Sequence, residues 1–213
     1  MKGKYFSIVS KNKKIIFSLL LIAPAYFISS SFKINNNTHL HSVHAMINEK
    51  DSLLSKKAFL EVYKVLISPR CMNCHPSGDI PLVGEDNHLH GQRVKRGDDG
   101  RGMYASKCIN CHMDQNTPGV NKPPGCPDWH MPPANMKMIF QGRTARELAA
   151  QLLNTSENGN KTSADLINFL EANQYVLAAW NPAEGRNSPP LSHDEFLKQF
   201  RLWIDNGAFL PDK

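Results

Sequence analysis

The chain has 213 residues, with 25 Lys and Arg against 19 Asp and Glu, a formal net charge of +6 at neutral pH. Five of the lysines fall in the first 30 residues, which contain no acidic side chain, so the remaining 20 basic and 19 acidic side chains leave a net charge of +1. Beyond residue 30 the chain is therefore nearly neutral, and it has no basic stripe interleaved with aromatic residues. These features argue against a nucleic-acid-binding protein. The length is sufficient for one domain of ordinary size.

The first 30 residues have the pattern of a secretory signal peptide. Lysines are followed by a mostly apolar run over residues 15–28, which is short for a membrane span of about 20 residues. Residues 1–30 are therefore expected to act as a signal peptide or as an uncleaved N-terminal anchor. We expect the rest of the chain in the periplasm or on the outer face of the cytoplasmic membrane, where cysteine pairs usually form disulfides.

A polar stretch follows. Residues 31–50 are rich in Asn, Ser and His and lack an apolar period, which predicts a flexible polar linker. Its histidines, His39, His41 and His44, are interpreted as solvated rather than metal-binding. From residue 51 to 68 the apolar residues recur at helical spacing, which predicts a helix that leads out of the linker.

Four of the five cysteines belong to a repeated motif. Cys-x-x-Cys-His occurs at residues 71–75 and again at 108–112. Residues 76–100 and 114–135 are rich in Gly, Pro or Asp and predict long loops, which are uncommon unless they carry function. The fifth cysteine, Cys126, is either a free thiol or part of an intermolecular disulfide.

Three helices are predicted after the second motif, over residues 144–154, 163–180 and 192–207. The first and the last begin with capping-box sequences, and Gly207 ends the last. No stretch of useful length alternates apolar and polar residues as a strand does. The predicted fold class is therefore all-α with extensive loops.

Three kinds of site use cysteines at this spacing. A disulfide within each motif would not require the histidine that follows it. A zinc site accepts two Cys-x-x-Cys pairs, but the 33 residues between Cys74 and Cys108 exceed the common spacing. Attachment of a c-type haem explains every position, because the two sulfurs bond the haem vinyl groups and the next residue ligates the iron.

The motifs therefore predict two haem c groups. The covalent attachments would be Cys71, Cys74, Cys108 and Cys111, with His75 and His112 as proximal iron ligands. Only 37 residues separate Cys71 from Cys108, which leaves little room for a complete domain between them. We expect one compact, cytochrome c-like domain over residues 51–213 that holds both haems.

The sixth ligand of each iron decides whether the site is closed or open to small molecules. For the first haem the candidates are His88 and His90, and His90 is favoured. For the second haem they lie in the sequence WHMPPANMKM, where His130 is narrowly favoured and Met131 or Met136 is the alternative. Methionines of this cluster that do not ligate are expected to pack on the haem face.

Other side chains near these motifs have two interpretations. His193, in the cap of the last predicted helix, is more consistent with a structural role. Three arginines either pair with haem propionates or are ordinary surface charges: Arg70, Arg93 and Arg96. The three tryptophans are expected to pack on haem or in the core: Trp129, Trp180 and Trp203.

Several short sequences between residues 59 and 211 occur together in one known family. They are Pro69-Arg70-Cys71, Asn73-Cys74-His75-Pro76, Gly78-Asp79, His90–Gly97, Asp99-Gly100, Trp129–Pro133, Met136, Trp203 and Gly207-Ala208. In these the chain resembles the bacterial dihaem c-type cytochromes often labelled "isoquinoline 1-oxidoreductase subunit". The resemblance implies electron transfer from a molybdenum hydroxylase-type dehydrogenase. The chain departs from the family pattern at Cys126, where the family has another residue, and at Phe209, where the family has Cys.

Electron transfer through the two haems, in the periplasm or at the cell surface, is therefore the leading prediction. The partners would be a dehydrogenase as donor and another cytochrome or a terminal oxidase as acceptor, with no nucleic acid and no membrane contact except through an N-terminal anchor. The chain is then an electron-transfer protein or the cytochrome subunit of an oxidoreductase rather than an independent catalyst. The alternatives are a small dihaem peroxidase, or another haem enzyme with one open iron site, and a haem-based sensor.

Overall fold

The computed structural model describes residues 36–213, so the predicted signal peptide or anchor at residues 1–30 lies outside the described residues. Within the described range there are six α-helices, two short 3-10 helices and four two-residue strands. The helices are α1 (Asn36–Leu66), α2 (Pro69–Met72), α3 (Ala145–Leu153), α4 (Ser163–Ala172), α5 (Gln174–Ala178) and α6 (His193–Asp205), with the 3-10 helices η1 (Cys108–Asn110) and η2 (Ala134–Met136). The strands are β1 (Leu82–Val83), β2 (His88–Leu89), β3 (Gly102–Met103) and β4 (Ser106–Lys107).

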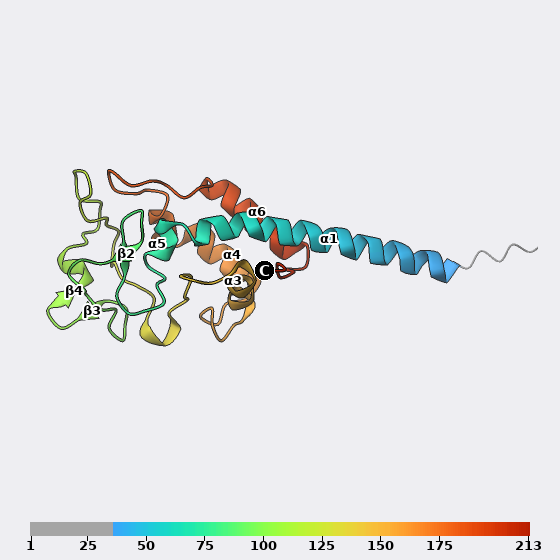
Figure 1. Ribbon diagram of the computed structural model, residues 1–213, viewed down its shortest axis with the longest axis horizontal. Helices are drawn as coiled ribbons and strands as arrows, with labels where there is room; N and C mark the ends of the chain where they lie inside the picture. Colours follow the sequence, from blue (N-terminus) through green and yellow to red (C-terminus); the bar gives the residue numbers. More distant parts are fainter. Residues whose placement is uncertain (1–35) are drawn as a thin grey trace, which may run out of the picture.

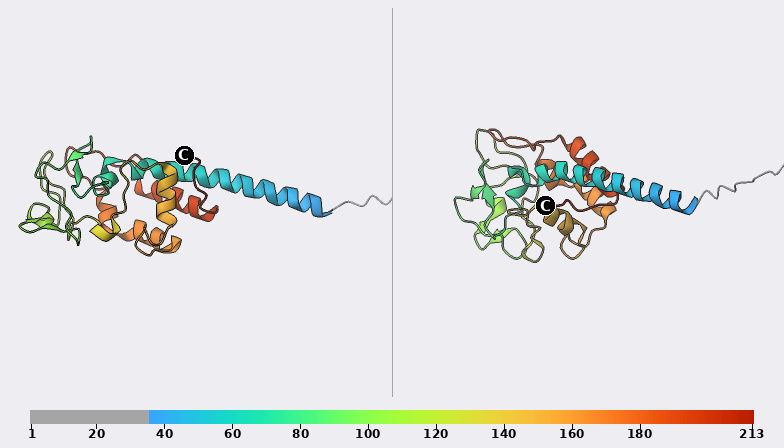
Figure 2. Two further views of the ribbon diagram at one scale, coloured as in Figure 1. Left: turned by 60° about the horizontal axis from the view of Figure 1, so that its bottom comes forward. Right: turned by 45° about the vertical axis from the view of Figure 1, so that its right-hand side comes forward.

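Helix α1 begins earlier than predicted. The structure has residues 36–50 in this helix, so the prediction of a flexible linker is wrong for that part of the range 31–50. Residues 36–66 contain no Gly or Pro that would break a helix. Packing of the second half stabilises the helix, which therefore extends back to residue 36. The first half of α1 extends away from the other elements, whereas the second half packs among them (Figures 1 and 2). The side chains of His39, His41 and His44 lie outside the described ones.

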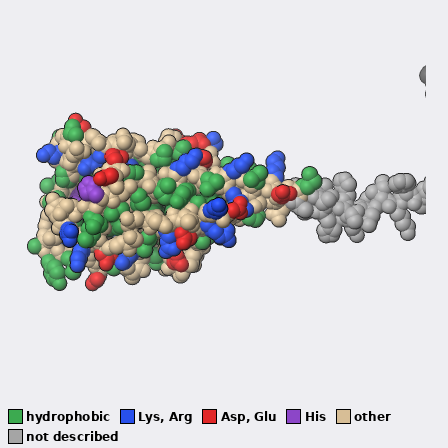
Figure 3. All heavy atoms as spheres, viewed as in Figure 1, with side chains coloured by type: hydrophobic (Ala, Val, Ile, Leu, Met, Phe, Trp, Pro, Cys, Tyr) green, Lys and Arg blue, Asp and Glu red, His purple; other side chains and the backbone are tan. Residues whose placement is uncertain are grey.

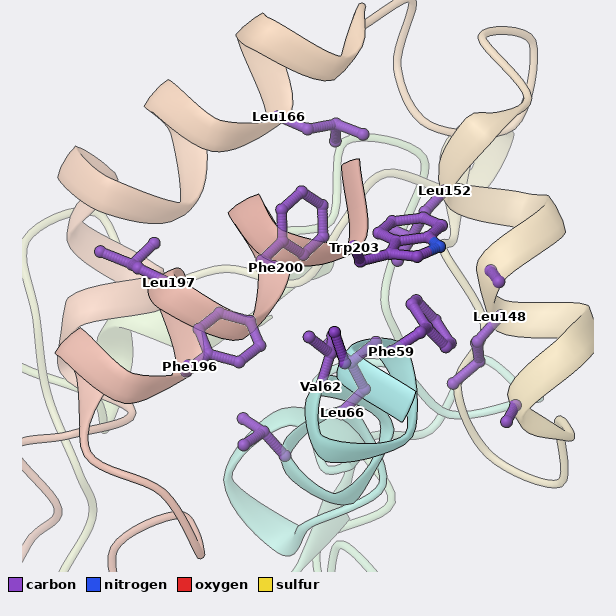
Figure 4. Packing of buried hydrophobic residues seen from close by; sticks show 14 of the residues in the cluster. Phe59, Val62, Leu66, Leu148, Leu152, Leu166, Phe196, Leu197, Phe200 and Trp203 are labelled. Carbon is purple, nitrogen blue, oxygen red and sulfur yellow. The ribbon is translucent and has the colours of Figure 1, made fainter. Parts of the chain in front are cut away.

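The core lies between α1, α3 and α6. Their inner faces carry apolar, buried residues at helical spacing: Phe59, Val62 and Leu66 on α1, Leu148 and Leu152 on α3, and Phe196, Phe200 and Trp203 on α6. Figure 4 shows these side chains turned toward a shared interior. The ring centres of Phe59 and Trp203 are 4.5 Å apart, so α1 and α6 are in direct contact.

A buried serine joins α1 to the C-terminal tail. The Ser55 hydroxyl donates to the carbonyl oxygen of Trp203 at 2.9 Å and accepts the N–H of Phe209 at 3.0 Å. Ser55 has no exposed surface, so both hydrogen bonds are shielded from water. They hold the end of α6 and the tail that follows it against α1.

The helix ends test the capping predictions. Thr144 and Glu147 form the predicted capping box of α3, and Ser192 caps α6 by accepting the N–H of Glu195. The prediction of one helix over residues 163–180 is wrong at Asn173, whose extended backbone separates α4 from α5. The Asn173 side chain accepts the N–H of Tyr175, so this residue ends one helix and begins the next.

The prediction of an all-α, cytochrome c-like fold is also wrong. Over residues 36–213, β1 pairs with β2 and β3 with β4 in two antiparallel hairpins beside the six α-helices, which makes the architecture a mixed one of helices and short strands. Nor do three or more His, Cys, Asp or Glu side chains gather anywhere in that range in a group able to hold a metal ion. Strands of two residues are too short for the alternation that reveals a strand in sequence.

The hairpins and long loops lie together at the end of the molecule farthest from the start of α1 (Figure 1). Both cysteine motifs border this loop-rich end, one directly after α1 and one directly after β4. Among the helices of the described part, none is long and apolar enough to cross a membrane.

Candidate functional site

The first motif occupies the turn that follows α1. Ser68 and Pro69 start the one-turn helix α2, where a proline is favourable because its missing N–H has no partner to lose. The turn continues as the N–H of Cys74 bonds the carbonyl of Cys71 at 3.2 Å and the N–H of His75 bonds that of Met72 at 3.0 Å. Tight winding of this kind brings both sulfurs and the imidazole to the wall of one cavity.

That cavity, which we call the first cavity, has a volume of about 440 Å³ and lies between the first motif, the segment 126–140 and helices α4–α6. Aromatic and aliphatic side chains supply most of its described lining: Leu66, Trp129, Met131, Met136, Met138, Phe140, Leu152, Leu166, Phe169, Leu170, Tyr175, Val176, Trp180, Phe196 and Phe200. The same lining includes Arg70 and Lys161 and no Asp or Glu. A cavity of this size and character suits an apolar ligand with an acidic edge.

His75 is held in one orientation by two contacts. Its Nδ1 is 2.6 Å from the carbonyl oxygen of Met138, and its ring stacks on Phe140 with centres 4.0 Å apart. Burial lowers the pKa of His75 to about 4, so the imidazole is neutral at pH 7. Since a carbonyl only accepts, Nδ1 carries the proton and the lone pair of Nε2 remains for a metal.

The thiols of the first motif are protonated. Burial raises the pKa of Cys71 to about 12 and that of Cys74 to about 11, with neighbouring thiols adding to the effect of desolvation. Neither sulfur is therefore a free thiolate nucleophile at neutral pH. Cys126, which is buried, lines the same cavity, and burial raises its pKa as well.

The second motif repeats the arrangement of the first around its histidine. Nδ1 of His112 is 2.7 Å from the carbonyl oxygen of Pro124, and the ring lies parallel to Trp129, with centres 4.6 Å apart and 2° between the planes. Burial is the main cause that lowers the pKa of His112, which leaves this imidazole neutral too. Each motif thus presents a neutral histidine, bonded to a backbone carbonyl through Nδ1 and stacked on an aromatic ring.

The surroundings of the second motif are more open. Cys111 is exposed, and the neighbouring Ile109 and Met113 have 56% and 59% of their surface exposed. Hydrophobic side chains of this kind appear on the surface of the loop-rich end in Figure 3. Apolar side chains gathered beside two thiols and a histidine are consistent with a surface that a bound group covers.

The structure reverses the expected pairing of distal candidates with motifs. His130 and Met131, predicted to serve the second motif, line the first cavity together with Met136. His90, predicted to serve the first, lies beside the second, with its ring centre 6.4 Å from that of His112. The other histidine candidates are elsewhere. His88 is exposed and bonds Asp86 at 2.7 Å, and His193 contacts the carbonyl of Leu170 at 2.9 Å, as a structural role requires.

His130 belongs to a polar network at the edge of the first cavity. Its Nδ1 is 2.6 Å from the carbonyl oxygen of Asp128 and 3.1 Å from the hydroxyl of Tyr175. The carboxylate of Asp128 pairs in turn with Arg101. Sequence reasoning missed Tyr175 and Phe140, because nothing in a helical tyrosine or a loop phenylalanine signals contact with a residue so distant along the chain.

The three arginines considered for an acidic ligand have different environments. Arg70 lines the first cavity, is bonded to Glu85 at 2.6 Å and has a buried Nε without a hydrogen-bond partner among the described residues. Arg96 is 1% exposed and donates to the carbonyls of Pro132 and Gly78. Arg93 is exposed. Arg70 is therefore the one of the three on the cavity wall, and Lys161 is a basic residue that sequence reasoning missed.

Comparison with known proteins gives no match among protein-family models, curated proteins or solved structures. The resemblance to the dihaem cytochromes labelled "isoquinoline 1-oxidoreductase subunit" therefore stays a prediction, as do the haems themselves.

Proposed function

We propose that this chain attaches two c-type haems, at residues 71–75 and 108–112, and transfers electrons outside the cytoplasm. The repeated arrangement of the two motif histidines is the observation that carries the proposal. A hydrogen bond from Nδ1 to a carbonyl fixes the tautomer that ligates through Nε2 and raises its basicity, as second-shell partners of metal-bound histidines do. A disulfide within each motif requires no histidine, whereas haem attachment requires one directly after each second cysteine.

The first cavity fits the proposed group. Two thiols and the free Nε2 of His75 face a largely apolar space, which is what covalent attachment and proximal ligation need. The Nε of Arg70, buried without a partner among the described residues, suits a propionate at the acidic edge, and Lys161 adds a second positive charge. The same lining contains His130, Met131 and Met136, which are the candidate sixth ligands.

The second site also fits. Two imidazoles that bind one metal through nitrogens about 2 Å from it have ring centres at most roughly 6 Å apart. The 6.4 Å between His90 and His112 agrees with that separation. Because Nδ1 of His112 is engaged by a carbonyl, its Nε2 is the nitrogen left to ligate. We therefore propose that His112 and His90 would hold the metal of the second site.

When bound, each haem would supply a one-electron carrier. The chain's own contribution is to hold the ligands, exclude water from the first site and expose the second. A dehydrogenase donor, of the molybdenum hydroxylase type that the resemblance implies, and a cytochrome or terminal oxidase acceptor are the proposed partners. Export directed by residues 1–30 would place the protein in the periplasm or on the outer face of the cytoplasmic membrane.

The proposal is tested by expressing the full-length chain in a bacterium that attaches c-type haem in its periplasm. Intact mass should show two haems on the wild type and one on each of the double variants, Cys71→Ala with Cys74→Ala and Cys108→Ala with Cys111→Ala. A carbon monoxide difference spectrum of the reduced protein then reports on the sixth ligands. No shift means that both irons are closed and supports an electron carrier, whereas a wild type without covalent haem refutes the proposal.

The network of His130, Tyr175 and Asp128 favours a second candidate, a small dihaem peroxidase. These groups line or border the first cavity and are able to hold and move a proton there if a methionine, or no residue, is the sixth ligand. A carbon monoxide shift assigned to the first site, together with peroxide turnover, would favour this candidate over the electron carrier.

A further inference from the structure

Trp129 lies between the two motifs and touches both sites. Its indole is parallel to the ring of His112, with 4.6 Å between centres, and it also lines the first cavity, where Cys71, Cys74 and His75 are found. Stacked rings with centres at this separation are in van der Waals contact across their faces. One side chain thus connects the proximal ligand of the second motif with the space proposed for the first haem.

The backbone that follows Trp129 fixes this position. The N–H of Met131, two residues on, donates to the carbonyl oxygen of Gly100 at 3.0 Å, and the Cys108 sulfur lies 3.8 Å from the same oxygen. Gly100 is buried, and a Cβ there would overlap the carbonyl oxygen of Met131. The segment that carries Trp129 is therefore packed directly against the second motif.

We propose that Trp129 is the bridge through which electrons pass between the two sites, an inference that rests on the proposed function. One electron leaves the reduced iron of one site and reduces the ferric iron of the other, so no further oxidant or reductant is needed. The indole provides a continuous π contact with His112 and is not itself oxidised. Trp129 acts through His112 and is a positioning residue rather than a ligand.

The two sites differ in exposure, and this difference indicates at which site a redox partner exchanges electrons. The first motif lines a cavity, whereas Cys111, Ile109 and Met113 of the second are exposed. A redox partner therefore gains its closest approach at the second site. An electron exchanged there would pass to the first site through His112 and Trp129, whose rings are stacked.

The test compares Trp129→Phe, Trp129→Leu and the control Tyr104→Leu in the full-length, haem-loaded protein. Tyr104 is 86% exposed in the turn before the second motif, so its variant removes an aromatic ring from the same end without altering the cavity lining. Intact mass first establishes the number of haems. A photochemical donor then delivers, in a short pulse, less than one electron per molecule to the fully oxidised protein, and the redistribution of the electron is followed in the visible spectra of the two sites. Electron paramagnetic resonance of the second site reports the orientation of His112 independently.

We expect Trp129→Leu to keep two haems and to slow redistribution by roughly tenfold or more, or about 1.4 kcal/mol in activation free energy. Trp129→Phe should recover most of the rate, and Tyr104→Leu should match the wild type. Unchanged redistribution in Trp129→Leu with both haems present overturns the inference and leaves the proposed function intact. Loss of the second haem from both Trp129 variants also overturns it, because Trp129 is then structural. A wild type without haem refutes the proposed function instead.

Discussion

The contact between Gly100 and Met131 should be the most sensitive point of the loop-rich end. Gly100 has φ +82° and is buried, and a Cβ added to it would overlap the Met131 carbonyl oxygen. Gly142 is a matched control, since its φ is +76° but a Cβ there would meet nothing within 4 Å. Both alanine variants carry the penalty of a left-handed backbone, about 1–2 kcal/mol, and only Gly100→Ala adds overpacking, worth about 1–3 kcal/mol.

We therefore expect Gly142→Ala to lower the free energy of unfolding by about 1 kcal/mol and Gly100→Ala to lower it by about 3 kcal/mol. Urea unfolding of the full-length, haem-loaded protein measures both. Gly100→Ala should also disturb the spectrum of the second site, because the displaced segment carries Trp129 away from His112. Equal destabilisation by the two variants, with an unaltered spectrum in each, would refute the reasoning, since it would mean that the Met131 contact does not constrain the segment.

Three further predictions follow from single contacts. Ser55→Ala should lower the free energy of unfolding by about 2 kcal/mol, because the N–H of Phe209 loses its acceptor, the fully buried Ser55 hydroxyl, and an m-value equal to that of the wild type would show that the denatured state is unchanged. His90→Ala should open one iron to carbon monoxide in the difference spectrum, and a spectrum without a shift would remove His90 as the ligand opposite His112. Cys126→Ser should retain two haems by intact mass, since in the proposed function the motif cysteines supply all four attachments, and loss of a haem would assign Cys126 to attachment.

The parts of the fold that sequence predicts well are governed by neighbours along the chain. The box of Thr144 and Glu147 and the cap at Ser192 depend on side chains three residues apart, so their geometry is settled locally and is confirmed. The apolar spacing of residues 51–66 likewise predicts the packed half of α1. Asn173 shows the limit of this approach, because the same side chain is tolerated inside a helix and also able to cap the next one.

The two hairpins were not predicted because their strands are very short and their turns depend on unusual backbone conformations. Each strand has two residues, and the turns depend on left-handed backbone at Asn87 and Tyr104. Asparagine adopts that conformation readily, but tyrosine does so only where surrounding contacts impose it. The residues before and after such a turn give no alternation to detect, so an all-α prediction was the natural error.

The placement of the distal candidates His90 and His130 also depends on contacts that no local sequence pattern reveals. Sequence reasoning assigns His90 and His130 to the nearer motif along the chain, because a short loop has a high chance of closing on itself. In the folded chain, Gly100 is hydrogen-bonded to Met131 and Asp98 to Ala134. These bonds between distant loops bring the segment after Trp129 against the first cavity rather than the second motif. With that segment in place beside the first motif, His90 is left facing His112. The motifs are thus identifiable from residue type and spacing, whereas the partner of each histidine depends on contacts between loops about 30 residues apart, which no local pattern encodes.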